Sequence, residues 1–140
     1  MVRRMACLFV VIIILVPVAA FAQSAGKEKA AVASAEKWLG LVDSGQYAES
    51  WKAAATYFRN NVTGQKWNEA MEGMRKPMGE LVSRKLKAAA YKTSLPGAPD
   101  GEYVVMQFDS SFSNKKSAVE TVTAVLGKDG KWRSVGYFIR

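Results

Sequence analysis

Residues 117–140, SAVETVTAVLGKDGKWRSVGYFIR, decide the fold, because two runs rich in Val, Thr and aromatic residues flank Asp129-Gly130. Both residues of this pair tolerate the positive φ that a two-residue type I′ turn requires. The stretch therefore predicts a β-hairpin. A two-residue turn would place Val122 opposite Tyr137 and Glu120 opposite Ile139.

Two more strand signals precede the hairpin. Residues 102–110 contain the apolar run 103–106, and Leu86, Ala88 and Ala90 alternate with basic or small residues before a Pro/Gly-rich turn at 96–101. Four consecutive strand patterns joined by short turns predict an antiparallel meander.

The first half of the chain has helical periodicity instead. Apolar residues recur at helical spacing from Ala31 to Val42 and from Tyr47 to Phe58, and Thr63 is placed to cap a third helix that ends near Met78. Three helices before four strands predict an α+β fold, with the helices packed on a curved four-stranded antiparallel meander sheet. A helical bundle with a separate hairpin and an all-β barrel both conflict with this order of patterns.

The chain begins with a pattern typical of an export signal. Arg3 and Arg4 precede an apolar run from Leu8 to Ala20, and 20–22 is an A-x-A cleavage site. We expect a signal peptide at 1–22, cleaved after Ala22, and a single α+β domain at 23–140. The mature protein would then be periplasmic or secreted, without a membrane span.

The residue counts exclude several chemistries. The sequence has no histidine, and its one cysteine, Cys7, lies within the expected signal. The usual zinc, copper and iron ligands are therefore missing from the mature protein, as are Cys nucleophiles and His proton carriers. We expect neither a metal nor a cofactor.

Several segments resemble one bacterial family. Residues 38–51 (WLGLVDSGQYAESW) resemble its leading signature, and 129–133 (DGKWR) with 136–139 (GYFI) resemble its closing hairpin. The segments 79–84 and 103–108 also fit. The family is the domain of unknown function 4019, and the resemblance implies an exported bacterial protein with no assigned activity.

The helix–turn–helix start and the closing D-G-x-W hairpin also resemble the cone-shaped superfold of nuclear transport factor two and the steroid isomerases. Cystatins are a looser comparison, and their Q-x-V-x-G loop is absent here. The resemblance implies a pocket between helices and sheet, and no particular reaction.

One carboxylate is a candidate for catalysis. If a loop centred on Ser113 joins the preceding strands, Gln107 lies across from Glu120, among apolar neighbours. Burial would raise the pKa of Glu120 and suit it to acid–base work, with Tyr137 as oxyanion donor. A hydrogen-bonded structural role for Glu120 is the alternative. The candidate ligand-binding residues are Trp67, Met71, Gln107 and Glu120.

A cluster of basic residues is a second candidate site. The formal net charge is +8, and much of it gathers between residues 75 and 92. Such a patch would attract an anionic envelope polymer; the alternative is a solvated helix end and a lysine-protected edge strand. The polyanion candidates are Arg75, Lys76, Arg84, Lys85 and Lys87.

The sequence therefore favours a non-catalytic binding module with a helix–sheet cleft. Its partner would be a small apolar ligand or an envelope protein, not nucleic acid, and a homodimer through the outer sheet face is a further expectation. The alternatives are a small lyase or isomerase that uses Glu120 with a tyrosine, and a binder of anionic polymer.

Overall fold

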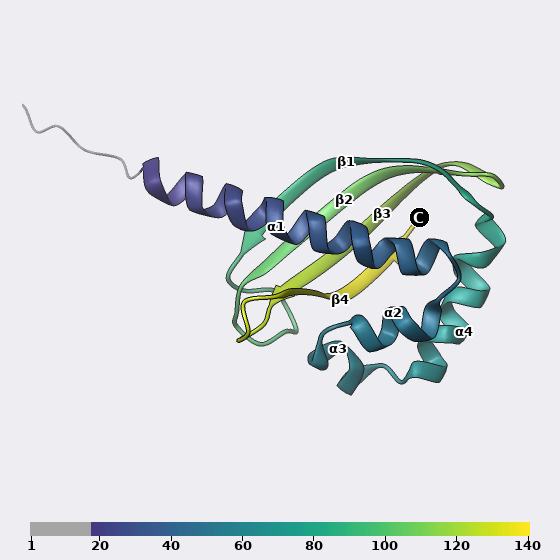
Figure 1. The fold of residues 1–140 in the computed structure, drawn as a ribbon, viewed down its shortest axis with the longest axis horizontal. Helices are drawn as coiled ribbons and strands as arrows, with labels where there is room; N and C mark the ends of the chain where they lie inside the picture. The colour runs from purple at the N-terminus through teal and green to yellow at the C-terminus, as the bar shows by residue number, and fades with distance from the viewer. Residues whose placement is uncertain (1–17) are drawn as a thin grey trace, which may run out of the picture.

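The computed structural model describes residues 18–140, in which an α-helical half precedes a four-stranded sheet (Figure 1). The helices are α1 (Val18–Asp43), α2 (Tyr47–Ala53), α3 (Thr56–Asn61) and α4 (Gly64–Met74), followed by a short 3-10 helix, η1 (Lys76–Met78). The strands are β1 (Leu81–Lys92), β2 (Tyr103–Phe112), β3 (Lys115–Leu126) and β4 (Trp132–Ile139). They form an antiparallel sheet in the order β1-β2-β3-β4, so the predicted α+β meander is confirmed.

The long helix α1 lies across one face of the sheet and contacts all four strands (Figure 1). Its apolar stripe, from Ala31 to Val42, is buried against the sheet as the sequence predicts. The N-terminal end of α1 projects beyond the sheet, and Phe21 there is exposed. Most of the expected signal peptide, residues 1–17, lies outside the described residues, while 18–22 begin α1.

The predicted second helix is divided into α2 and α3. Ala54 and Ala55 between them are extended, with ψ of 162° and 150°, and the backbone N–H of Ala55 donates to the carbonyl of Ser134 at 2.9 Å. A bond to the edge strand β4 thus replaces a helical bond at this point. The third helix begins as predicted, because the Thr63 side chain accepts a hydrogen bond from the Lys66 N–H.

The β3–β4 hairpin has a longer turn than predicted. The N–H of Gly127 donates to the carbonyl of Lys131, and Gly130 alone takes a positive φ of 77°. This is a three-residue loop, so the two-residue type I′ turn is wrong. An irregularity between Thr123 and Ala124 shifts the register back, and the predicted pairs Val122–Tyr137 and Glu120–Ile139 are both present.

In the β2–β3 hairpin, by contrast, the strand pairing differs from the prediction. Its two-residue turn pairs Phe112 with Lys115, but the register shifts at Ser111 and Glu120 then lies opposite Phe108 instead of Gln107. The predicted pairing of Gln107 with Glu120 is therefore wrong by one residue. Since one residue reverses the face of a strand, Gln107 lies on the face of the sheet away from α1.

The space between the helices and the sheet is filled by aromatic side chains. The ring centroid of Trp67 lies 5.8 Å from that of Trp38, 5.3 Å from Phe58 and 6.2 Å from Tyr137. Both indole N–H groups are satisfied by Ser50, since Trp38 donates to its carbonyl and Trp67 to its hydroxyl. These residues belong to one continuous core.

Candidate functional site

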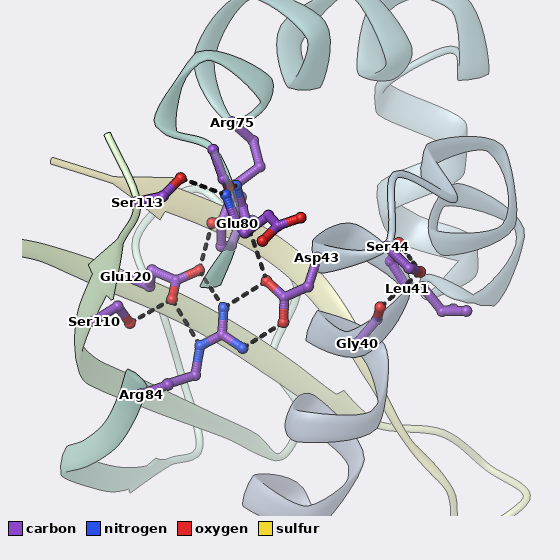
Figure 2. Close-up of polar contacts among 12 residues, drawn as sticks. Gly40, Leu41, Asp43, Ser44, Arg75, Glu80, Arg84, Ser110, Ser113 and Glu120 are labelled. Carbon is purple, nitrogen blue, oxygen red and sulfur yellow. Dashed lines mark hydrogen bonds and ion pairs between the residues drawn. The ribbon is translucent and has the colours of Figure 1, made fainter. Parts of the chain in front are cut away.

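A largely buried ionic cluster lies where the end of α1 meets β1 and β3 (Figure 2). Nε of Arg84, on β1, lies 2.7 Å from Oε1 of Glu120 on β3, and Nη1 of Arg84 lies 2.7 Å from Oδ2 of Asp43, the last residue of α1. Figure 2 shows the guanidinium between the two carboxylates. The cluster therefore joins the first helix to two strands of the sheet.

Three further side chains complete this ionic cluster. The hydroxyls of Ser110 and Tyr137 each donate to Glu120 at 2.5 Å, and Arg75 donates to Asp43 at 3.2 Å. Arg75 also donates to the carbonyl of Gly79, and its guanidinium carbon lies 4.2 Å from the ring centroid of Phe112. Two arginines thus balance two carboxylates.

The environment fixes the charge states of two members of the ionic cluster. Burial of Tyr137, together with the negative charge and hydrogen bond of Glu120, raises the pKa of the phenol well above its ordinary value. Burial opposes the charged form of Arg84, but the hydrogen bonds to Asp43 and Glu120 outweigh it and raise the Arg84 pKa. Tyr137 is therefore a neutral donor and Arg84 a cation at neutral pH.

Glu120 is enclosed by protein groups within the ionic cluster. Its side chain is completely buried, and Arg84, Ser110 and Tyr137 together give its two oxygens four hydrogen bonds. A carboxylate so enclosed has no contact with solvent in this conformation. The geometry corresponds to the structural alternative that the sequence left open for Glu120.

The four predicted ligand-binding residues do not share a cleft. Trp67 and Met71 are buried in the aromatic core, Glu120 is enclosed by the ionic cluster, and Gln107 lies on the far face of the sheet. The structure brings Trp67 and Tyr137 into an edge-to-face contact within the core.

The predicted polyanion-binding residues also lie apart. Arg75 is buried and Arg84 is largely buried, and both are paired with carboxylates, whereas Lys76 pairs with Glu72 on α4. The other two, Lys85 and Lys87, are exposed on β1, where Nζ of Lys87 lies 3.7 Å from Asp109. The five residues therefore do not form one basic surface.

Beside the ionic cluster lies a shallow charged groove of about 310 Å³ at the end of α1. Both signs of charge line it, including Asp43, Glu72, Glu80, Arg75 and Lys76. Because Lys76 is paired with Glu72 and Arg75 with Asp43, the groove offers little net charge to a ligand.

A more apolar groove lies between α1 and the edge strand β4, at the opening of the helix–sheet layer; we call it the α1–β4 groove. Its deeper part has a volume of about 350 Å³, and a shallower part of about 300 Å³ continues along α1. Both parts are lined by Ser34, Lys37 and Trp132. The deeper part is also lined by Trp38, Leu41, Ala53, Arg133 and Ser134.

Two hydrogen bonds hold the walls of the α1–β4 groove together. The hydroxyl of Ser34 donates to the carbonyl of Trp132 at 2.7 Å, and the N–H of Ala55 donates to the carbonyl of Ser134 at 2.9 Å. These bonds satisfy carbonyls on the free edge of β4, which would otherwise invite strand pairing. The groove lies between these two hydrogen bonds.

One polar atom beside the α1–β4 groove has no hydrogen-bond partner among the described residues. Ser134 as a whole is 4% exposed, and its buried hydroxyl forms no hydrogen bond with any residue from 18 to 140. A buried polar group without a partner costs about 1–3 kcal/mol of stability.

The sequence alone did not identify this groove. Trp132 and Ser134 lie on the same face of a predicted strand, because they are two residues apart. Lys37 and Trp38 lie on a predicted helix. No local sequence pattern indicates that this strand and this helix meet. The contact between Ser34 and Trp132 spans 98 residues of chain. The one available signal of the groove was Trp132 at the start of a strand, followed by a small polar residue, Ser134, on the same face.

Residues 18–140 place no three acidic, histidine or cysteine side chains where they would hold a metal ion. Within the same part of the chain, no helix has the length and apolar character needed to cross a membrane.

Comparison with known proteins gives one match. The model of a family described as "Protein of unknown function (DUF4019)" matches residues 34–137, so the chain belongs to that family. No curated protein and no solved structure matches the chain.

Proposed function

We propose that this member of the DUF4019 family is a non-catalytic binding module of the bacterial cell envelope, which holds a small apolar ligand in the α1–β4 groove. The observation that carries the proposal is the groove of about 350 Å³ lined by Trp38, Leu41 and Trp132, with the unpaired hydroxyl of Ser134 buried beside it. The aromatic side chains supply apolar contact for a ligand, as in most small-molecule sites.

The α1–β4 groove supports this role better than the two sites suggested by sequence. Glu120 already has four hydrogen bonds, which leaves no position for a substrate at its carboxylate. The side chains around Ser134, in contrast, are open to a ligand from the surface: Ala53 is exposed at the rim and Leu41 is partly exposed.

An envelope location is the second part of the proposal. It rests on Arg3 and Arg4, the apolar run that follows them and the A-x-A pattern at 20–22. Fractionation of the native host, with N-terminal sequencing of the mature protein, tests it. We expect periplasmic or secreted material that begins at Gln23; a cytoplasmic chain that retains Met1 would contradict the location.

Binding is tested with octan-1-ol, an uncharged apolar probe, by following the ¹H–¹⁵N spectrum of the mature protein. We expect saturable shifts of the Trp132 indole and the Ser134 amide. Ala53→Trp fills the groove and should abolish these shifts. Ala48→Trp provides the matched control, since Ala48 is exposed on the same helix and lines none of the grooves described above. Absence of saturable shifts in the unmodified protein would refute the proposed groove.

A further inference from the structure

The charged residues that line the α1–β4 groove are all basic. Lys37 lines both of its parts, Lys131 lines the shallower part and Arg133 the deeper part, and no acidic residue among 18–140 lines either. This differs from the charged groove at the end of α1, where acids and bases are mixed.

The lysines at this groove are also free to bind an anion. Arg133 is paired with Asp129 at 2.7 Å, but neither Lys37 nor Lys131 forms an ion pair with any residue from 18 to 140. Both side chains are exposed, so their charges face the solvent at the rim. Trp132, like Lys37, lines both parts of the groove.

The apolar part and the basic rim therefore lie next to each other along one groove. The deeper part offers Trp38, Leu41 and Trp132 as apolar contacts, and the rim offers two unpaired ammonium groups. A ligand that matches both parts has an apolar body and a negatively charged end. Burial of the apolar body supplies most of the affinity, and the rim charges select the sign of the head group.

We infer that the α1–β4 groove selects a small amphipathic carboxylate, with its apolar body against Trp132 and Trp38 and its carboxylate at Lys37 and Lys131. This inference rests on the proposed function and specifies its ligand class.

Three probes of equal chain length test the ligand class: octanoate, octan-1-ol and octylammonium, each titrated below its micelle concentration. Exposed ion pairs contribute modestly, so we expect octanoate to bind about three- to tenfold more tightly than octan-1-ol, and octylammonium to bind most weakly. The advantage of octanoate should shrink at high salt.

The double variant Lys37→Gln/Lys131→Gln should reduce the affinity for octanoate to that for octan-1-ol and leave octan-1-ol unaffected. The matched control is Lys29→Gln/Lys128→Gln, which removes the same charge outside the lining of the groove. An equal loss in both double variants would overturn the inference, because it would show a general effect of net charge.

The outcomes separate the inference from the proposed function. If octan-1-ol binds and octanoate binds no more tightly, the ligand class is wrong and the apolar groove stands. If no probe binds, both fail. If native mass spectrometry shows a dimer that Ala53→Trp converts to a monomer, a second copy covers the groove, and this also overturns both.

Discussion

Nε of Arg84 lies 2.7 Å from a carboxylate oxygen of Glu120, although 36 residues separate them in the sequence. The Glu120 side chain is completely buried, and that of Arg84 is 10% exposed. A buried pair of this kind adds little net stability over an apolar pair of the same shape. Removal of one partner, however, leaves the other charge buried without a counter-charge. The pair therefore makes the position of β1 relative to β3 sensitive to either residue.

Glu120→Gln should lower the free energy of unfolding by about 3–5 kcal/mol, because Arg84 would lose its charged partner in the interior. Urea denaturation followed by circular dichroism measures this loss. Glu80→Gln is the control, since Glu80 is exposed and forms no ion pair with the described residues, and it should change stability by less than about 0.5 kcal/mol. A loss of under about 1 kcal/mol for Glu120→Gln would contradict the assigned structural role.

Stability should fall at alkaline pH because of Tyr137. Burial and the adjacent Glu120 raise the pKa of its phenol in the folded protein, whereas the unfolded chain ionises near pH 10. The contribution of Tyr137 to stability is thus complete below about pH 10 and is lost as pH rises through the folded pKa. Tyrosinate absorbance should show one tyrosine that ionises only with unfolding. Tyr137→Phe should remove that step, and its persistence in the variant would refute the assignment.

Alanine substitutions at two buried serines should change the free energy of unfolding in opposite directions. Ser134→Ala removes an unpaired hydroxyl and should raise the free energy of unfolding by about 1 kcal/mol in the absence of ligand. Ser110→Ala removes a donor to Glu120 and should lower it by about 1–2 kcal/mol. Thermal and urea unfolding of both variants give the comparison. A clear loss of stability in Ser134→Ala would mean that this hydroxyl has a partner in solution.

Glu102 should hold the first half of α1 to the sheet. It accepts hydrogen bonds from Lys27 on α1 and from Tyr91 on β1, and its pKa is lowered chiefly by the hydrogen bond from Lys27. Glu102→Gln should therefore speed hydrogen exchange at residues 27–31 while leaving the core strands unchanged. Glu36→Gln, on an exposed position of α1, should leave that exchange unaltered. Equal exchange in both variants would show that α1 does not need this contact.

Gly79 should tolerate alanine less well than Gly130 does. Both have positive φ, 81° and 77°, so alanine strains each by about 1–3 kcal/mol. A Cβ at Gly79 would also overlap the hydroxyl of Ser113, whereas nothing lies within 4 Å of one at Gly130. Urea denaturation should show the larger loss for Gly79→Ala. The double variant Gly79→Ala/Ser113→Ala should recover part of it, and no recovery would place the cost elsewhere.

The order of elements was predictable because it depends on local patterns. The stripe from Ala31 to Val42 has the period of a helix, and residues 117–140 have the composition of strands around an Asp-Gly turn. The break between α2 and α3 was not predictable. It depends on the bond from Ala55 to Ser134, and the residues at the break are both alanines with strong helix propensity.

The candidate site was predictable only in part. Glu120 and Tyr137 were expected on one face of the sheet, and they are hydrogen-bonded there. Their partner Arg84 was assigned to a surface patch, because a basic residue in an alternating strand gives no sign of what lies above it. Gln107 was misplaced because the register shift at Ser111 moves every later pair of the hairpin by one residue.

The sequence by itself determined the α+β class, the helical stripes, the strands and the absence of histidine, since each follows from composition or from a period of a few residues. The tertiary structure alone decided that Arg84 bridges Asp43 and Glu120, and that Trp132 and Ser134 meet α1 in a groove with a basic rim. The physical reason is that these contacts join residues separated by 36 to 98 positions in the sequence, so they depend on how whole elements pack. Local propensity depends on a few neighbouring residues and therefore gives no information about that packing.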